Sequence, residues 1–146
     1  MILDRGTYKL IESHFKTYIA DKAYVSLLRE EIAESICPAP DSGGRKGAVS
    51  DPTAGKAMRI EKETKEYTPW FEVIELTVNY FDDEAKREYG DVRNGKGEYI
   101  RKVYFDGLPL VRTMHALDIS EGTYFNWRRD ILNRAAIFAS AYGLIE

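Results

Sequence analysis

Residues 108–129, LPLVRTMHALDISEGTYFNWRR, carry the clearest structural pattern in the chain. Two short helical patterns meet here, and Ser120 can cap the start of the second. The apolar positions recur where two helices joined by a tight turn would need them: Leu117, Ile119, Tyr124 and Trp127. This spacing predicts a helix-turn-helix within about residues 108–142.

The second helix of this motif would expose a polar face near its N-terminus. Asn126 has the groups to pair with an adenine edge, Arg129 with guanine, and Glu121 with a cytosine amino group. The predicted base-reading residues are Glu121, Thr123, Phe125, Asn126 and Arg129. The predicted phosphate contacts are Ser120, Arg101, Lys102, Arg112, Arg128 and Arg134.

Two residues depart from the usual motif. Asp118 stands at the turn position where glycine is common, and Asp adopts the left-handed conformation more readily than most residues. Met114 stands where a small alanine usually lets the two helices approach. We therefore expect a helix-turn-helix whose turn is formed by Asp118.

Segment 7–36 contains neither proline nor glycine, and its apolar residues alternate at steps of three and four. This spacing predicts one long helix with a narrow apolar stripe. The stripe residues that we assign to oligomerisation are Ile11, Phe15, Tyr18, Val25, Leu28 and Ile32. Either the stripe forms a dimeric coiled coil or it packs on the body of its own chain, and the basic seam residues Lys22 and Arg29 weaken the coiled-coil case.

Turn-forming residues divide the rest of the chain. We expect a helical arm over 1–36, a flexible linker over 37–49 and a helical domain over 50–146. Within that domain, helix starts are predicted at Ser50-Asp51-Pro52-Thr53, with the helix reaching about Tyr67, at Thr68-Pro69, and at the Asp82-Asp83 cap of a short helix 83–89. Further helices are expected from Glu98 to Phe105 and from Ser120 to about Tyr142. The predicted fold class is all-α.

Composition limits the class of protein. The chain has 146 residues, 44% of them apolar, and it contains no apolar run long enough to span a membrane. The first residues lack the pattern of a signal peptide, so we expect a soluble cytoplasmic protein. One cysteine and two distant histidines, His14 and His115, offer no metal-ligand set, and no catalytic constellation is apparent. We expect no cofactor, no small-molecule substrate and no enzymatic activity.

The formal net charge of −3 is the sum of two parts of the chain with opposite net charges. Residues 1–85 hold 11 Lys and Arg against 16 Asp and Glu, a net charge of −5. Residues 86–146 hold 10 against 8, a net charge of +2. The asymmetry favours a nucleic-acid-binding face in the C-terminal part.

The C-terminal half resembles a known family. Tyr99–Phe105, Leu117–Ser120 and Thr123–Leu132 are similar to the corresponding segments of phage and prophage transcriptional regulators of the ArpU/RinA type, whose C-terminal region is like region four of sigma factors. The resemblance implies promoter binding that activates late or morphogenetic phage genes in the cytoplasm of a bacterial host, with the base-reading residues in Ser120–Arg129. It also raises the question of a contact with RNA polymerase.

The residues and the resemblance together predict a homodimeric, sequence-specific regulator that binds double-stranded DNA. One alternative is a phage DNA-packaging subunit of the small-terminase kind, which also joins a helix-turn-helix to an oligomerising segment. The other is a helical interaction protein without a nucleic-acid role, in which residues 7–36 would bind a partner.

Overall fold

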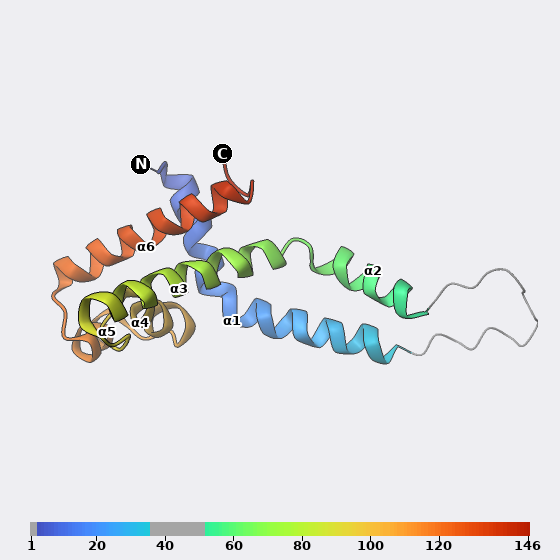
Figure 1. The fold of residues 1–146 in the computed structure, drawn as a ribbon, viewed down its shortest axis with the longest axis horizontal. Helices are drawn as coiled ribbons and strands as arrows, with labels where there is room; N and C mark the ends of the chain where they lie inside the picture. Colours follow the sequence, from blue (N-terminus) through green and yellow to red (C-terminus); the bar gives the residue numbers. More distant parts are fainter. Residues whose placement is uncertain (1–2, 36–51) are drawn as a thin grey trace, which may run out of the picture. The chain divides into compact units, whose positions relative to one another are not determined.

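The computed structural model describes residues 3–35 and 52–146, and all the regular secondary structure in them is helical (Figure 1). The elements are α1 (Arg5–Glu34), α2 (Pro52–Thr64), α3 (Thr68–Tyr89), α4 (Lys96–Ile100), the π-helical segment η1 (Arg101–Phe105), α5 (Leu110–Leu117) and α6 (Glu121–Ala141). The all-α class and the long N-terminal helix are therefore confirmed. None of these helices has both the length and the apolar character needed to cross a membrane.

The chain divides into two compact units. The larger unit combines Met1–Ile19 with Pro69–Glu146, and the smaller unit is Ala20–Thr68. Helix α1 contributes its first half to the larger unit and its second half to the smaller one. The candidate linker 37–49 and the candidate caps Ser50 and Asp51 lie outside the described residues.

The smaller unit is a helical hairpin. The Lys56 ammonium donates to the Ala33 carbonyl oxygen at 3.0 Å, and the Tyr24 and Tyr67 rings lie 5.7 Å apart. Because late residues of α1 meet early residues of α2, the two segments run antiparallel. Pro52 is the first residue of α2, as predicted, but the helix ends at Thr64 rather than near Tyr67.

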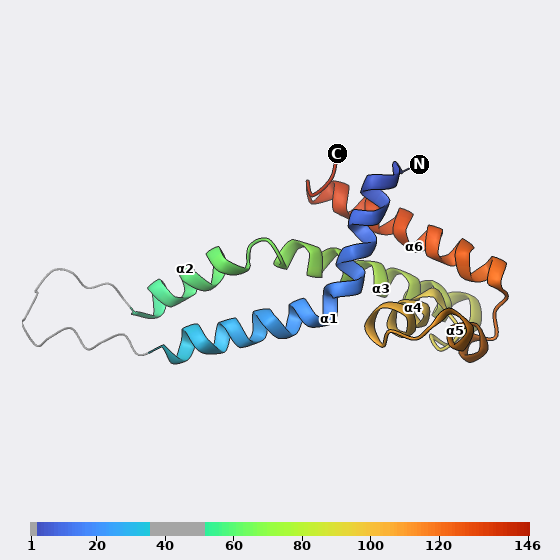
Figure 2. The ribbon, with the colours of Figure 1, turned by 180° about the vertical axis from the view of Figure 1, so that it is seen from behind.

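The core of the larger unit comes from every helix in it. Its most deeply buried side chains include Ile11, Phe15, Val73, Ile74, Thr77, Tyr99, Ile100, Ile131 and Leu132. Figures 1 and 2 show the first turns of α1 crossing α6. Three fully buried alanines, Ala135, Ala136 and Ala139, allow close packing along α6.

Helix α3 corrects the prediction for residues 83–89. It runs without interruption to Tyr89, so the separate helix 83–89 capped by Asp82-Asp83 was wrong. No glycine or proline interrupts residues 70–89, and the Asp82 carboxylate accepts hydrogen bonds from Arg101 instead of capping a helix. Thr68 is the first residue of α3, and its hydroxyl donates to the Thr64 carbonyl.

Two glycines bring the start of α4 against α3. A Cβ atom added to Gly97 would lie 2.0 Å from Asp82 Oδ1, and one added to Gly95 would lie 2.5 Å from the Ala85 Cβ atom. The predicted helix over 98–105 therefore begins two residues earlier, at Lys96, and its second half is π-helical. This close approach orients the segment that carries Tyr99 and Arg101.

We expect Gly97→Ala to lower the free energy of unfolding, because the added methyl overlaps a carboxylate that Arg101 holds in place. A loss of roughly 1–3 kcal/mol is the usual range for overpacking. Urea denaturation followed by circular dichroism measures it.

The matched control is Gly55→Ala in α2, where an added Cβ meets no atom within 4 Å. In an open helical position this change should raise stability by about 0.5–1 kcal/mol. Equal effects of the two substitutions would show that the packing at Gly97 has no energetic weight.

Candidate nucleic-acid interface

The turn between α5 and α6 forms where the sequence predicts it. Asp118 adopts the left-handed conformation, with φ 53° and ψ 52°. The Ile119 N–H donates to the Met114 carbonyl at 3.0 Å, and the Asp118 N–H donates to the His115 carbonyl at 3.3 Å. These two bonds are those of a Schellman motif, which satisfies carbonyls at the end of α5.

Ser120 caps α6, as predicted. Its Oγ accepts a hydrogen bond from the Thr123 N–H at 3.1 Å, and its hydroxyl donates to Thr123 Oγ1 at 3.0 Å. Such a cap contributes typically about 1 kcal/mol of helix stability. Thr123 is half-buried and engaged with Ser120, so its hydroxyl is partly committed inside the protein.

The predicted motif core faces the interior. Leu117 is 3% exposed and Tyr124 is 9% exposed, whereas Ile119 and Trp127 are half-buried. The Tyr124 ring centroid lies 4.9 Å from that of Tyr99, a fully buried residue of α4, and the Trp127 ring lies 6.3 Å from it. Tyr99 therefore packs α4 against the inner face of α6.

Four of the five predicted base-reading residues share the opposite face of α6. Glu121, Phe125, Asn126 and Arg129 are all exposed, and they recur at the three- and four-residue steps of one helical surface. Arg129 Nη2 donates to Asn126 Oδ1 at 3.2 Å, which holds the two side chains as a pair. Phe125 keeps 46% of its surface exposed despite its apolar ring. The fold thus presents a mixed polar and apolar surface beside the capped end of the helix.

The predicted phosphate contacts fall into two groups. Ser120 is exposed beside the turn, and Arg112 is exposed in the first turn of α5. The other four have partners inside the larger unit: Arg101 with Asp82 and Glu98, Lys102 with Glu98, Arg128 with Glu12, and Arg134 with the Tyr80 hydroxyl and ring. Arg101 and Arg128 bind carboxylates within the protein. They are therefore not among the residues that we propose to contact phosphate.

Glu12 is the residue that sequence reasoning missed. It lies on the buried face of α1, and it accepts hydrogen bonds from Arg128 Nε and Nη2, both at 2.6 Å, and from the Tyr104 hydroxyl at 2.7 Å. One carboxylate therefore joins α1, η1 and α6. The sequence shows only that a charged residue adjoins Ile11 of the apolar stripe. It does not show the partners of Glu12, which lie 92 and 116 residues away in sequence.

The environment of Glu12 favours its charged form. Burial alone would raise the pKa of the carboxyl, but the hydrogen bonds from Arg128 and Tyr104 outweigh burial and lower the pKa below its ordinary value of 4.5. The same pairing raises the pKa of Arg128. Both groups therefore stay charged at neutral pH.

We expect Glu12→Gln to destabilise the protein by about 3 kcal/mol at pH 7, because it leaves the Arg128 charge without a counterion in a partly buried site. Since folding lowers the pKa of Glu12, its stabilising contribution is complete above pH 4.5 and is lost as the pH falls through the folded value. Urea titrations between pH 3 and pH 7 should show the gap between variant and wild type closing at low pH.

Glu63→Gln is the matched control, since Glu63 pairs with Arg59 at 3.1 Å on the surface, where side chains of the pair are 39% and 57% exposed. An exposed pair of this kind contributes about 0–1 kcal/mol. A Glu12→Gln effect no larger than the Glu63→Gln effect would refute the structural role of Glu12.

The predicted oligomerisation residues lie mostly inside the monomer. In the larger unit, Ile11 and Phe15 are fully buried, with the Phe15 ring 5.4 Å from Tyr104, and Tyr18 packs 5.7 Å from Phe71. In the smaller unit, Val25 and Ile32 are buried and Leu28 is half-buried. These side chains pack within their own chain. This is the second of the two alternatives that the sequence allowed, the first being a dimeric coiled coil.

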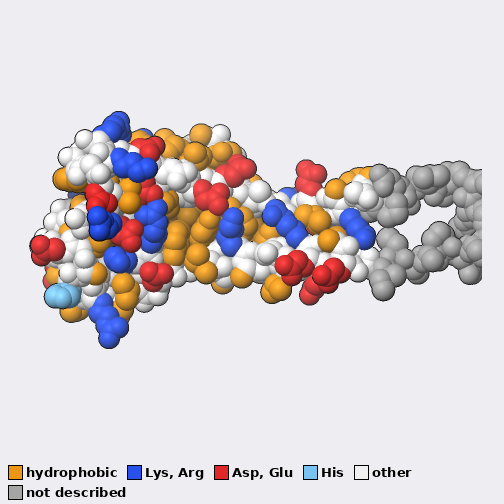
Figure 3. Space-filling model, turned by 60° about the horizontal axis from the view of Figure 1, so that its bottom comes forward, with side chains coloured by type: hydrophobic (Ala, Val, Ile, Leu, Met, Phe, Trp, Pro, Cys, Tyr) orange, Lys and Arg blue, Asp and Glu red, His pale blue; other side chains and the backbone are white. Residues whose placement is uncertain are grey.

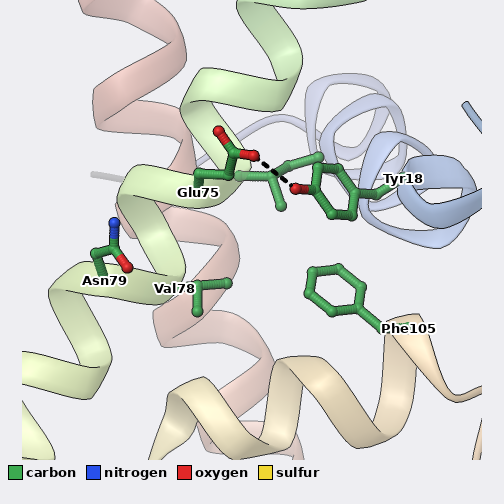
Figure 4. A pocket seen from close by; sticks show the side chains of 6 residues that line it. Tyr18, Glu75, Val78, Asn79 and Phe105 are labelled. Atoms are coloured by element: carbon green, nitrogen blue, oxygen red, sulfur yellow. Dashed lines mark hydrogen bonds between the residues drawn. The ribbon is translucent and has the colours of Figure 1, made fainter. Parts of the chain in front are cut away.

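A pocket of about 250 Å³ opens between α1, α3 and η1 (Figure 4). Its lining residues are Tyr18, Ile74, Glu75, Val78, Asn79 and Phe105. The Tyr18 hydroxyl donates to Glu75 at 2.8 Å, and burial together with this bond raises the pKa of Tyr18, so the hydroxyl stays protonated. We assign this hydrogen bond to the packing of α1 on α3 rather than to chemistry.

Other surfaces give no sharper candidate. Across residues 3–35 and 52–146, no three His, Cys, Asp or Glu side chains gather as metal ligands would. On the face drawn in Figure 3, basic and acidic side chains lie interspersed. The exposed face of α6 is therefore the best-defined candidate site.

Comparison of the chain with protein-family models, with curated proteins and with solved structures finds no match. We therefore base the functional proposal on the geometry of α5 and α6 and on the resemblance found in the sequence.

Proposed function

We propose that the protein is a sequence-specific regulator of transcription that binds double-stranded DNA through α6, in a phage or prophage setting. The observation that carries this proposal is the division of the N-terminal half of α6 into two faces. Tyr124 and Ile131 are buried, while Glu121, Asn126 and Arg129 are exposed next to a capped N-terminus and a tight turn. This is the arrangement in which a recognition helix enters the major groove. The phage setting comes from the resemblance alone.

The chemistry of the exposed face suits base reading. Arg and Asn side chains make paired hydrogen bonds to guanine and adenine, respectively, and an apolar side chain can meet a thymine methyl group. The Asn126–Arg129 hydrogen bond restrains both side chains before binding, which lowers the entropic cost of binding. Phe125 supplies the apolar component from the same face.

A homodimer belongs to this proposal, because two linked motifs would read two half-sites and compensate for few charges in each copy. The contact between copies would use surface outside the buried stripe. Tyr24, Leu27 and Met58 of the smaller unit are exposed apolar side chains of the kind such a contact needs.

We expect Arg129→Ala to weaken binding to the preferred duplex by about 1–3 kcal/mol, through loss of preference at one base pair. In vitro selection of bound duplexes identifies the preferred site, and fluorescence anisotropy measures affinity for it and for single-base variants. Arg93→Ala is the matched control, because Arg93 is exposed and pairs with Asp91 outside α5 and α6.

Failure of selection to enrich any duplex would refute the proposal and favour a helical interaction protein without a nucleic-acid role. Light scattering adds a second test. A ring of eight or more chains would favour a DNA-packaging subunit over a dimeric regulator.

A further inference from the structure

Hydrogen bonds and a cation–ring contact join the first turns of α1 to α6, the proposed recognition helix. Glu12 binds Arg128 through two hydrogen bonds of 2.6 Å, and the Arg128 guanidinium lies 5.1 Å from the centre of the Tyr8 ring. Burial raises the pKa of the Tyr8 hydroxyl, and the positive charges of Arg128 and Arg129 oppose this rise. Figures 1 and 2 show the first turns of α1 crossing the C-terminal half of α6. The N-terminal half of α1 therefore packs against the helix that carries the candidate interface.

This part of α1 carries a row of basic residues: Arg5, Lys9 and Lys16. At about 100° per residue, all three lie within about 60° of Glu12 around the helix axis, on the side away from Tyr8. All three are exposed. We call this set the α1 basic row.

The acidic groups near the row are already engaged. Glu12 is paired with Arg128, and its distance to the Lys16 ammonium, whose side chain is 64% exposed, is longer at 3.7 Å. Asp4 caps α1 by accepting a hydrogen bond from the Thr7 N–H at 2.7 Å. The side chains of Arg5 and Lys9 form no ion pair or hydrogen bond with any residue in the described part of the chain.

We infer that the α1 basic row contacts the phosphodiester backbone of duplex DNA beside the groove that α6 enters. The inference rests on the proposed function and names a second contact surface for it. Phosphates line both sides of a major groove about 12 Å wide, so an element that crosses a recognition helix can meet one of these strands. A second source of phosphate contacts is needed because the neighbouring arginines of α6 already have partners. Arg128 binds Glu12, and Arg129 is paired with Asn126.

The test is the salt dependence of duplex binding by the double variant Arg5→Gln/Lys9→Gln. Removing one phosphate-binding cation should reduce the slope of log affinity against log salt concentration by about 0.9, so removing both should reduce it by about 1.8. Affinity should fall by the same factor for the preferred and for unrelated duplexes, because phosphate binding carries no sequence information. Lys16 is left unchanged because it lies beside Glu12.

Lys62→Gln/Lys65→Gln is the control, since it removes the same formal charge from exposed positions at the end of α2. A wild-type protein that binds no duplex overturns the proposed function. Wild-type binding with an unchanged slope in the Arg5/Lys9 variant overturns only the role of the α1 basic row. An equal drop in slope for both double variants also overturns it, by showing an effect of net charge alone.

Discussion

The buried carboxylate of Glu12 is the constraint on which the larger unit depends. Removing a charge from water costs several kcal/mol, and a protein recovers this only when partners complete the hydrogen bonding of the charged group. Arg128 and Tyr104 provide those partners from α6 and η1. The orientation of α6 is thus tied to α1, the first helix in the chain.

The Glu12–Arg128 interaction gives the two adjacent arginines of α6, Arg128 and Arg129, different roles. Arg128 stands between Asn126 and Arg129 of the candidate interface in sequence, yet its guanidinium is turned inward to Glu12. Arg129 is one position further along the helix and points to solvent beside Asn126. Adjacent basic residues therefore divide between stability and recognition, because successive side chains of a helix point about 100° apart.

The candidate interface combines local and long-range contributions. Asp118 and Ser120 form the turn and the cap through bonds to residues no more than four or five positions away. Tyr99 then supports the inner face of α6 from α4, and Gly97 permits α4 to approach α3. A rigid support of this kind is what a base-reading helix requires, since hydrogen bonds to base edges tolerate little misplacement.

Near neighbours in the chain were enough to predict the long N-terminal helix, the left-handed turn at Asp118, the Ser120 cap and the exposed face with Asn126 and Arg129. The interactions between residues far apart in sequence became visible only in the folded chain. There Asp82 binds Arg101 rather than capping a helix, and Ile11 and Phe15 are buried within the monomer. Periodicity reveals which side of a helix is apolar, but it cannot reveal what that side packs against, because the partner is chosen by the folded chain as a whole.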